Sequence, residues 1–399
     1  MKKILTVALC SMAVCSLNAQ KVNVDAAKKL AGKIDKVEEA RALINEAKAN
    51  DETKNDPNTY FIAGKIEFDA FDKAAAKQKI NPNDKDVNPL NMAEQVVNGY
   101  NNMIQVFPLD TQDPKAKLSN DAKKKINGHF EDYTNAAVTF YNEKKFYPEA
   151  YTAFMIAGTL PKSELADKVV AAFPDSLVNQ SFFNAGLCAY SGNAVEEAAN
   201  AFKMGRMNNS DNEQNYIYEI ACWQYLASND STKEAVAKRE IDEIAKAGYA
   251  KFGMDQPVFF NNLINSLVMD EKMDDALALI NSQLQKTPDS ANLYGLLGYV
   301  NDRKGDDDAS VDAYRKAASM DNVDAETLKN VCKKLFKVGV AKRENLDPND
   351  AAAKQALKAD YFEAAKNVAL KAKQMSPDTT SDLDYVIENI DYALDSYFK

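Results

Sequence analysis

Few residues of this chain are of the types that usually carry catalysis or hold metals. Histidine, the commonest general base and metal ligand, occurs once, as His129. It follows Asn127-Gly128 at an expected helix start, which predicts a solvated or capping role. The acidic run 306–308 falls at an expected inter-helix turn, and it lacks the further spaced oxygen ligands of a calcium loop. We therefore predict no catalytic residue, no metal site and no cofactor.

The cysteines indicate packing rather than redox chemistry. Cys188, Cys222 and Cys332 each lie in an apolar, helix-like context, which is typical of small buried side chains. Their odd number argues against a disulfide framework. Cys188 and Cys222 are 34 residues apart, but stacked helices lie about 8–10 Å apart, which is too far for a disulfide.

The first nineteen residues have the layout of a secretory signal peptide. A basic start at Lys2-Lys3 precedes the apolar run 4–17, and Ala19 offers a cleavage site before Gln20. A lipoprotein signal is disfavoured because Leu9 and Val14, rather than small residues, precede Cys10 and Cys15. We expect export to the periplasm or cell envelope of a Gram-negative bacterium, or secretion from it.

The remaining chain, residues 20–399, is acidic and has no transmembrane segment. Loss of Lys2 and Lys3 leaves 47 basic and 59 acidic side chains, a net charge of −12. Such a surface repels phosphate backbones and anionic lipids, so no nucleic-acid partner is expected. No later apolar stretch approaches the length that spans a bilayer.

Apolar residues recur every three or four positions, which predicts amphipathic helices rather than strands. Two windows, from Pro257 and from Ala291, repeat one pattern 34 residues apart. Small residues at equivalent places, Gly298 in the first helix and Ala276 in the second, would let paired helices approach closely. Pro288 would then end the second helix of its window.

These windows resemble tetratricopeptide repeats, a family of 34-residue antiparallel helix pairs. Related windows begin near residues 131, 179 and 214, although individual units diverge. The resemblance implies an all-α, right-handed α-solenoid of antiparallel helix pairs with a C-terminal capping helix. We assign residues 1–19 to the signal peptide, 20–130 to degenerate N-terminal repeats, 131–324 to the repeat solenoid and 325–399 to a degenerate pair and the capping helix.

The flanking helices are less regular. We expect a pair or one long helix over 25–49, helices over 57–78 and 92–106, and a linker over 248–255. Nearer the end we expect helices over 328–340 and 351–375 and the capping helix over 382–397. No strong boundary divides the chain, because apolar periodicity continues throughout.

In the family, the first helix of each pair, helix A, lines a concave groove. Carried over to this chain, the groove positions are Asn135, Thr139, Asn142, Phe183, Asn184, Leu187, Tyr190, Tyr218, Tyr225, Asn261, Asn262, Asn265, Tyr299, Asp302 and Arg303. Asparagine can hold a peptide backbone and tyrosine adds rigid contact area; ordinary solvated surface is the other interpretation. Asn261 and Leu296 replace the lysine and asparagine with which some members bind a partner's terminal carboxylate.

Four Asp-Ser or Asp-Thr pairs fall in expected loops. Ser176, Ser231, Ser290 and Thr379 each follow an aspartate, in a pattern that resembles an O-glycosylation sequon of some Gram-negative bacteria. Such pairs are also common turn and helix-capping residues, which is the interpretation we favour.

Three functions remain open on the sequence alone. The favoured one is a non-enzymatic scaffold that binds a protein or peptide in the groove. The second is a glycan- or nutrient-binding helical-repeat protein of the cell envelope, against which stand the missing lipid signal and the single tryptophan. The third is a hydrolase, which would require two deep, close carboxylates in a cleft.

Overall fold

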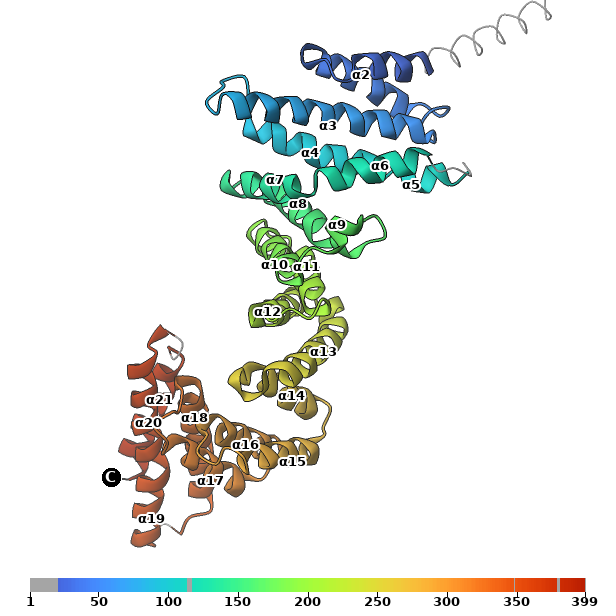
Figure 1. The fold of residues 1–399 in the computed structure, drawn as a ribbon. Coiled ribbons are helices and arrows are strands. Elements are labelled where there is room, and N and C mark those ends of the chain that lie inside the picture. The colour runs from blue at the N-terminus through green and yellow to red at the C-terminus, as the bar shows by residue number, and fades with distance from the viewer. Residues whose placement is uncertain (1–20, 113–116, 348, 379–380, 399) are drawn as a thin grey trace, which may run out of the picture. The chain divides into compact units, whose positions relative to one another are not determined.

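The computed structural model describes residues 21–112, 117–347, 349–378 and 381–398. These residues form helices joined by turns, and none of them lies in a strand (Figure 1). The chain is therefore all-α, as predicted. The helices fall into two compact units, one ending at Ile244 and the other spanning Ala245–Lys399. The border lies inside helix α13 (Glu234–Phe252).

The first unit is built from consecutive helices that pack as antiparallel pairs. The pairs are α3 (Pro57–Ile80) with α4 (Pro89–Met103), α7 (Phe130–Asn142) with α8 (Tyr147–Thr159), and α10 (Asp175–Ser191) with α11 (Val195–Met207). Each second helix also packs on the next first helix: α4 on α7, α8 on α10, and α11 on α12 (Glu213–Asn229). This alternation is the stacking predicted from the 34-residue period, and we keep the name helix A for α3, α7, α10 and α12.

The second unit continues the same alternation. Its pairs are α14 (Pro257–Met269) with α15 (Met273–Leu284), α16 (Ala291–Lys304) with α17 (Asp307–Ala318), and α18 (Ala325–Glu344) with α20 (Ala364–Met375). Before α20, the chain forms α19 (Ala351–Leu357) and a π-helical turn, Lys358–Glu363. In this unit α14, α16 and α18 are the A helices.

Capping residues define where several helices begin. Asp56 accepts a hydrogen bond from Asn58 N at 2.9 Å, and a proline follows it at the first position of α3. Asp306 accepts from Ala309 N at 3.0 Å and caps α17. The acidic run 306–308 is therefore part of a turn and a helix start, as predicted.

A glycine facing an aromatic ring holds paired helices close in both units. A Cβ at Gly186 of α10 would lie 2.4 Å from Phe202 Cε1 of α11, and one at Gly298 of α16 would lie 2.6 Å from Tyr314 Cδ1 of α17. Both rings follow their glycine by sixteen positions, 186 to 202 and 298 to 314. The predicted contact at Gly298 is confirmed, and Ala276 is fully buried in the core of the second unit.

The last described helix covers the end of the second unit. Helix α21 (Leu383–Tyr397) buries Leu383, Ile390 and Ala393 against α18 and α20. Its outward Tyr385 and Tyr392 are exposed. The predicted capping helix is confirmed.

Some predicted boundaries were wrong. Residues 21–30 and α2 (Val37–Ala49) are separate helices, so one long helix over 25–49 is excluded. The chain continues from α4 into α5 (Val106–Leu109), η2 (Asp110–Gln112) and α6 (Lys117–Gly128), none of which the sequence analysis predicted. Most of the expected linker 248–255 is helical, because α13 continues to Phe252 and packs Gly248 against Phe259.

Substitution of Gly186 tests the close packing of paired helices. Gly186→Ala should lower the free energy of unfolding of the first unit by about 1–3 kcal/mol, because the fully buried Phe202 ring must move. Trp223, the single tryptophan, lies in this unit and reports its urea unfolding by fluorescence. Gly128→Ala is the matched control, since a Cβ there meets no atom within 4 Å. Equal effects of the two substitutions would contradict the packing argument.

Candidate functional site

Eight of the fifteen predicted groove residues line three hollows, two in the first unit and one in the second. Asn135 and Thr139 line a hollow of about 330 Å³ between α3, α4 and α7. Leu187, Tyr190 and Tyr218 line one of about 260 Å³ between α10, α11 and α12, here called the aromatic hollow. Asn261, Asn265 and Tyr299 line a third hollow, of about 360 Å³ in the second unit, here called the amide hollow.

The amide hollow takes side-chain amides from three successive A helices. Asn261 and Asn265 come from α14, Asn292 from α16 and Asn330 from α18. Asn261 Nδ2 donates to Asn292 Oδ1 at 3.3 Å, and Asn292 Nδ2 donates to Asn261 Oδ1 at 3.1 Å. This reciprocal pair fixes both amides in one orientation. Each amide has a second N–H and a second lone pair beyond this contact.

The lining of the amide hollow also contains two aromatic and two acidic side chains. Tyr314, the ring that packs on Gly298, lines it together with Tyr299. At the rim, Asp324 accepts from Thr327 N at 2.6 Å and caps α18, while Glu326 pairs with Lys329 at 2.5 Å. Both carboxylates therefore already serve the start of α18. Uncharged hydrogen-bonding groups dominate what remains of the lining.

The aromatic hollow has an apolar lining. Phe202, Ala221 and Cys222 complete it beside Leu187, Tyr190 and Tyr218. The rings of Phe183 and Tyr218 are stacked with centroids 6.0 Å apart, and Phe202 lies 5.6 Å from Tyr218. Phe183 therefore supports the wall without lining the hollow.

Other predicted groove residues do not reach a hollow. Asn142, Tyr225 and Arg303 are exposed. Asn184 accepts from Gln180 within α10, and Asn262 donates to the Val258 carbonyl within α14. The structure thus brings only part of the predicted set together, and their role in binding stays a prediction.

Asp302 has a structural partner that the sequence did not reveal. Lys334 of α18 is 2% exposed, and its Nζ lies 2.6 Å from Asp302 and 2.5 Å from Asp307. The two carboxylates hold α18 against α16 and α17. The hydrogen bond from Lys334 lowers the pKa of Asp307.

A fourth hollow, of about 420 Å³, lies between α2, α3 and α4 and was not predicted from the sequence. It carries both charges, among them Arg41, Lys77 and Glu94, and the buried Gln95 Oε1 has no partner in the described part of the chain. Arg41 is engaged by a bidentate contact with Glu67 at 2.9 and 2.6 Å. No spacing rule could have found this hollow, because its residues belong to irregularly paired helices.

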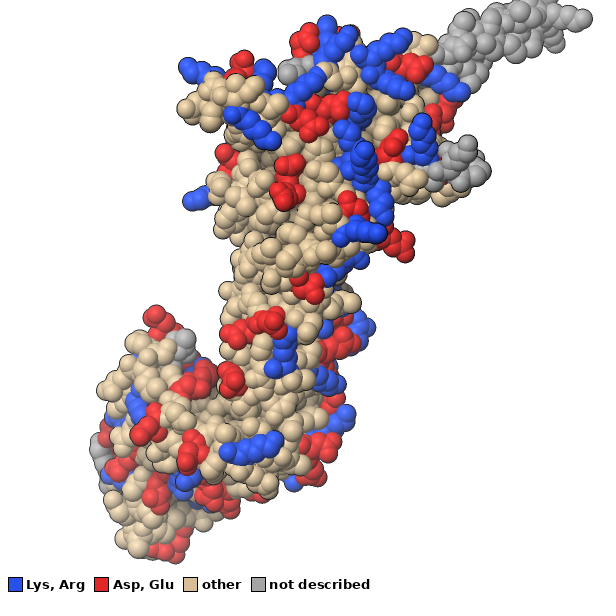
Figure 2. All heavy atoms as spheres, viewed as in Figure 1, with Lys and Arg blue, Asp and Glu red and all other residues tan. Residues whose placement is uncertain are grey.

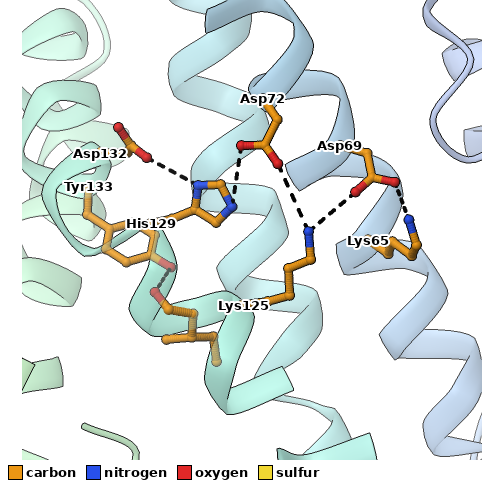
Figure 3. A network of polar contacts seen from close by, with 8 residues as sticks. Lys65, Asp69, Asp72, Lys125, His129, Asp132 and Tyr133 are labelled. Atoms are coloured by element: carbon orange, nitrogen blue, oxygen red, sulfur yellow. Dashed lines mark hydrogen bonds and ion pairs between the residues drawn. The ribbon is translucent and has the colours of Figure 1, made fainter. Parts of the chain in front are cut away.

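His129 occupies the N-cap position of α7 as predicted, but it is buried and its side chain makes no capping hydrogen bond, so the prediction of a solvated side chain is wrong. Its ring stacks on Phe68 with centroids 4.1 Å apart and meets Phe71 edge-on. Nδ1 lies 3.1 Å from Asp132, as Figure 3 shows. Nε2 lies 3.9 Å from Asp72. The imidazole therefore ties α3 to the start of α7.

Charged side chains of α3 and α6 form further polar contacts beside His129. Asp69 accepts from Lys65 and pairs with Lys125 at 3.4 Å (Figure 3). On the face shown in Figure 2, charged side chains crowd the helices α2 to α6 and are sparse around α8 and α10. Charged contacts in the N-terminal helices thus link α3 to α6.

Deeply buried carboxylates are paired with cations. Glu219, fully buried, accepts from Arg206 Nε at 2.7 Å and from Nη2 at 2.9 Å. Burial raises the pKa of Glu219, and the Arg206 contact opposes that rise. Lys203 donates to Glu240 at 2.7 Å. Neither carboxylate lines the hollows described above, so they do not form the carboxylate cleft of a hydrolase.

The three cysteines of the described chain are free and buried. Burial raises the pKa of Cys188 to about 11 and the pKa of Cys222 and Cys332 to about 12. Their thiols are therefore neutral near pH 7 and poorly nucleophilic.

The structure also describes three of the four proposed glycosylation residues. Ser176 and Ser231 are exposed, whereas Ser290 is half-buried and caps α16 by accepting from Leu293 N at 3.4 Å. Asp230, before Ser231, accepts from Thr232 N at 2.9 Å. Thr379 lies outside the described residues. Ser290 thus caps a helix and Asp230 stabilises a turn, as the favoured interpretation predicts. Glycosylation stays a prediction.

The described residues show neither a metal-binding cluster nor a membrane-spanning helix. No group of three or more His, Cys, Asp or Glu side chains in them could hold a metal ion. Among their helices, none has both the length and the apolar character needed to cross a membrane.

Comparison with known proteins gives only distant structural likenesses. No protein-family model matches the chain, and no curated protein is similar to it. It is similar to the APC/C hetero-tetramer Cut9–Hcn1 (13% identity, TM-score 0.34, 88% of this chain and 58% of that chain), the P58(IPK) TPR domain (11%, 0.29, 94% and 98%) and yeast Tom70 (14%, 0.26, 94% and 96%). The chain thus spans less than two thirds of the first of these, and likeness at this level assigns no function.

Acid unfolding tests the Lys334 contacts. Because the pKa of Asp307 is lowered from 3.8, its carboxylate stabilises the fold above that pH, and this contribution is lost as the pH falls through the lowered pKa. Lys334→Met should reduce the acid-dependent loss in unfolding free energy by up to about 1 kcal/mol, since Asp307 is half exposed and screened. Urea midpoints by circular dichroism from about pH 6 to pH 2.5 measure it. Lys286→Met, at an exposed site of the same unit, is the control; identical acid slopes in both variants would refute the pairing.

Proposed function

We propose that this chain is a non-enzymatic, exported scaffold that binds an extended segment of a partner protein on its helix-A side. The observation that carries the proposal is the amide hollow, in which three successive A helices present side-chain amides to one space of about 360 Å³. A site assembled from several repeats is suited to a ligand that runs across them.

Peptide backbone is the ligand that best matches this lining. An extended chain presents N–H and C=O groups along its length, and an asparagine side chain can donate to one and accept from the other. The Asn261–Asn292 pair holds two such amides in place before binding, which lowers the entropy lost on association. Tyr299 adds contact area beside them. These features support sequence-tolerant binding of a segment rather than chemistry on it.

A glycan-binding function is the second candidate, and one observation favours it. Tyr141, Tyr190 and Tyr225 are each about half exposed, at 46%, 55% and 46%, on A helices of the first unit. Exposed aromatic rings can stack on the apolar face of a sugar. Titration with neutral oligosaccharides, followed by Trp223 fluorescence, separates this candidate from peptide binding.

Substitution in the amide hollow tests the peptide proposal. Peptides selected from a random display library on the wild-type chain should bind Asn265→Ala about five- to tenfold more weakly, the loss of roughly one hydrogen bond. Asn281→Ala is the matched control, because Asn281 is exposed on α15, a second helix of its pair. Calorimetry gives both dissociation constants. Failure to select any peptide, or equal weakening by the two variants, would refute the proposal.

Export and glycosylation share one test. Intact-mass analysis of the protein from its native cells should show a chain that begins at Gln20, because cleavage after Ala19 removes the apolar run. Modification of Ser176, Ser231, Ser290 or Thr379 would add whole hexose masses to that value, and peptide mapping would place them. Recovery of the chain with Met1 and residues 2–19 attached would contradict export by this route.

A further inference from the structure

The aromatic hollow is preformed by packing within the first unit. Gly186 lets the Phe202 ring lie against α10, so that the ring becomes its floor. Phe183 stacks on Tyr218 and fixes one wall. The ring of Tyr190, 55% exposed, stands at the rim. A site with these supports needs little rearrangement to accept a ligand.

No ionised group lines the aromatic hollow. The thiol of Cys222 is neutral at pH 7, because burial raises its pKa to about 12. The nearby charges on α11 and α12, Arg206 and Glu219, already satisfy each other through two hydrogen bonds. A charged ligand group would therefore lose its hydration without gaining an opposite charge.

The size of the hollow limits what it can hold. Its volume of about 260 Å³ lies below the roughly 300–1,000 Å³ typical of sites for whole small molecules. One large side chain fits that scale better than a cofactor or an oligosaccharide. The hydroxyl groups of Tyr190 and Tyr218 can bond to polar backbone beside such a side chain.

We infer that the aromatic hollow is an anchor pocket for one large, uncharged apolar side chain, such as leucine, methionine or phenylalanine, of a partner protein. The inference rests on the proposed function, and it adds the residue class that the partner must present to the first unit. The pocket thus selects partner segments that carry such a side chain.

Protection of Cys222 from alkylation tests the chemistry of the pocket directly. N-acetyl-leucinamide and N-acetyl-phenylalaninamide, at millimolar concentration, should slow the reaction of Cys222 with N-ethylmaleimide at least threefold. Mass spectrometry measures the extent of modification of Cys222, with Cys188 and Cys332 of the same chain as references. N-acetyl-lysinamide and methyl glucoside should leave the rate unchanged. Equal protection by all probes, protection by the sugar alone, or none would overturn the inference.

A substitution that fills the pocket provides a second test. Ala221 is exposed and lines the hollow, so Ala221→Leu should occupy it without disturbing the core. It should abolish the protection of Cys222 by N-acetyl-leucinamide and weaken the selected peptides about tenfold. Gln224→Leu, also exposed on α12 but outside the lining, is the matched control and should bind within twofold of wild type. Thermal unfolding confirms that both variants fold.

The outcomes separate the two proposals. If selected peptides bind wild type and Ala221→Leu equally, the anchor pocket is refuted and the scaffold proposal stands. If no peptide is selected but the apolar amides protect Cys222, the pocket is supported and the scaffold proposal fails.

Discussion

The close approach of paired helices, made possible by a glycine opposite an aromatic ring, is the contact from which the rest of the structure follows. Phe202 fills the notch left by Gly186, and Tyr314 fills the one left by Gly298. The same two rings line the aromatic and amide hollows. One side chain in each unit therefore both packs a helix pair and lines the hollow beside it.

What each hollow can bind is then decided by a few outward side chains. Amides surround Tyr314 in the second unit, and tyrosines with an uncharged thiol surround Phe202 in the first. The buried charged contacts lie outside these linings and hold helices together. Arg206–Glu219 links α11 to α12, and Lys334 links α18 to the preceding pair. These buried charges are thus committed to helix packing.

The repeating part of this fold was predicted well from the sequence, because small and large residues that recur every 34 positions pack against each other in paired helices. Gly298, Ala276 and the capping helix follow directly from this period. The misses have tertiary causes: His129 is buried by Phe68 and Phe71, which precede it by some sixty positions, and the expected linker is helical because Gly248 packs on Phe259. Family positions located residues in three hollows, but they could not reveal that Lys334 engages Asp302. That partner lies 32 positions away in another pair.

Photo-crosslinking in native cells tests most directly whether the helix-A side binds the partner. A benzoylphenylalanine in place of Tyr190, on helix A of the first unit, is compared with one in place of Tyr392, on α21; the two side chains are similarly exposed, at 55% and 66%. The account predicts a discrete protein adduct from position 190 and none from position 392. An adduct only from position 392, or the same adducts from both, would contradict it.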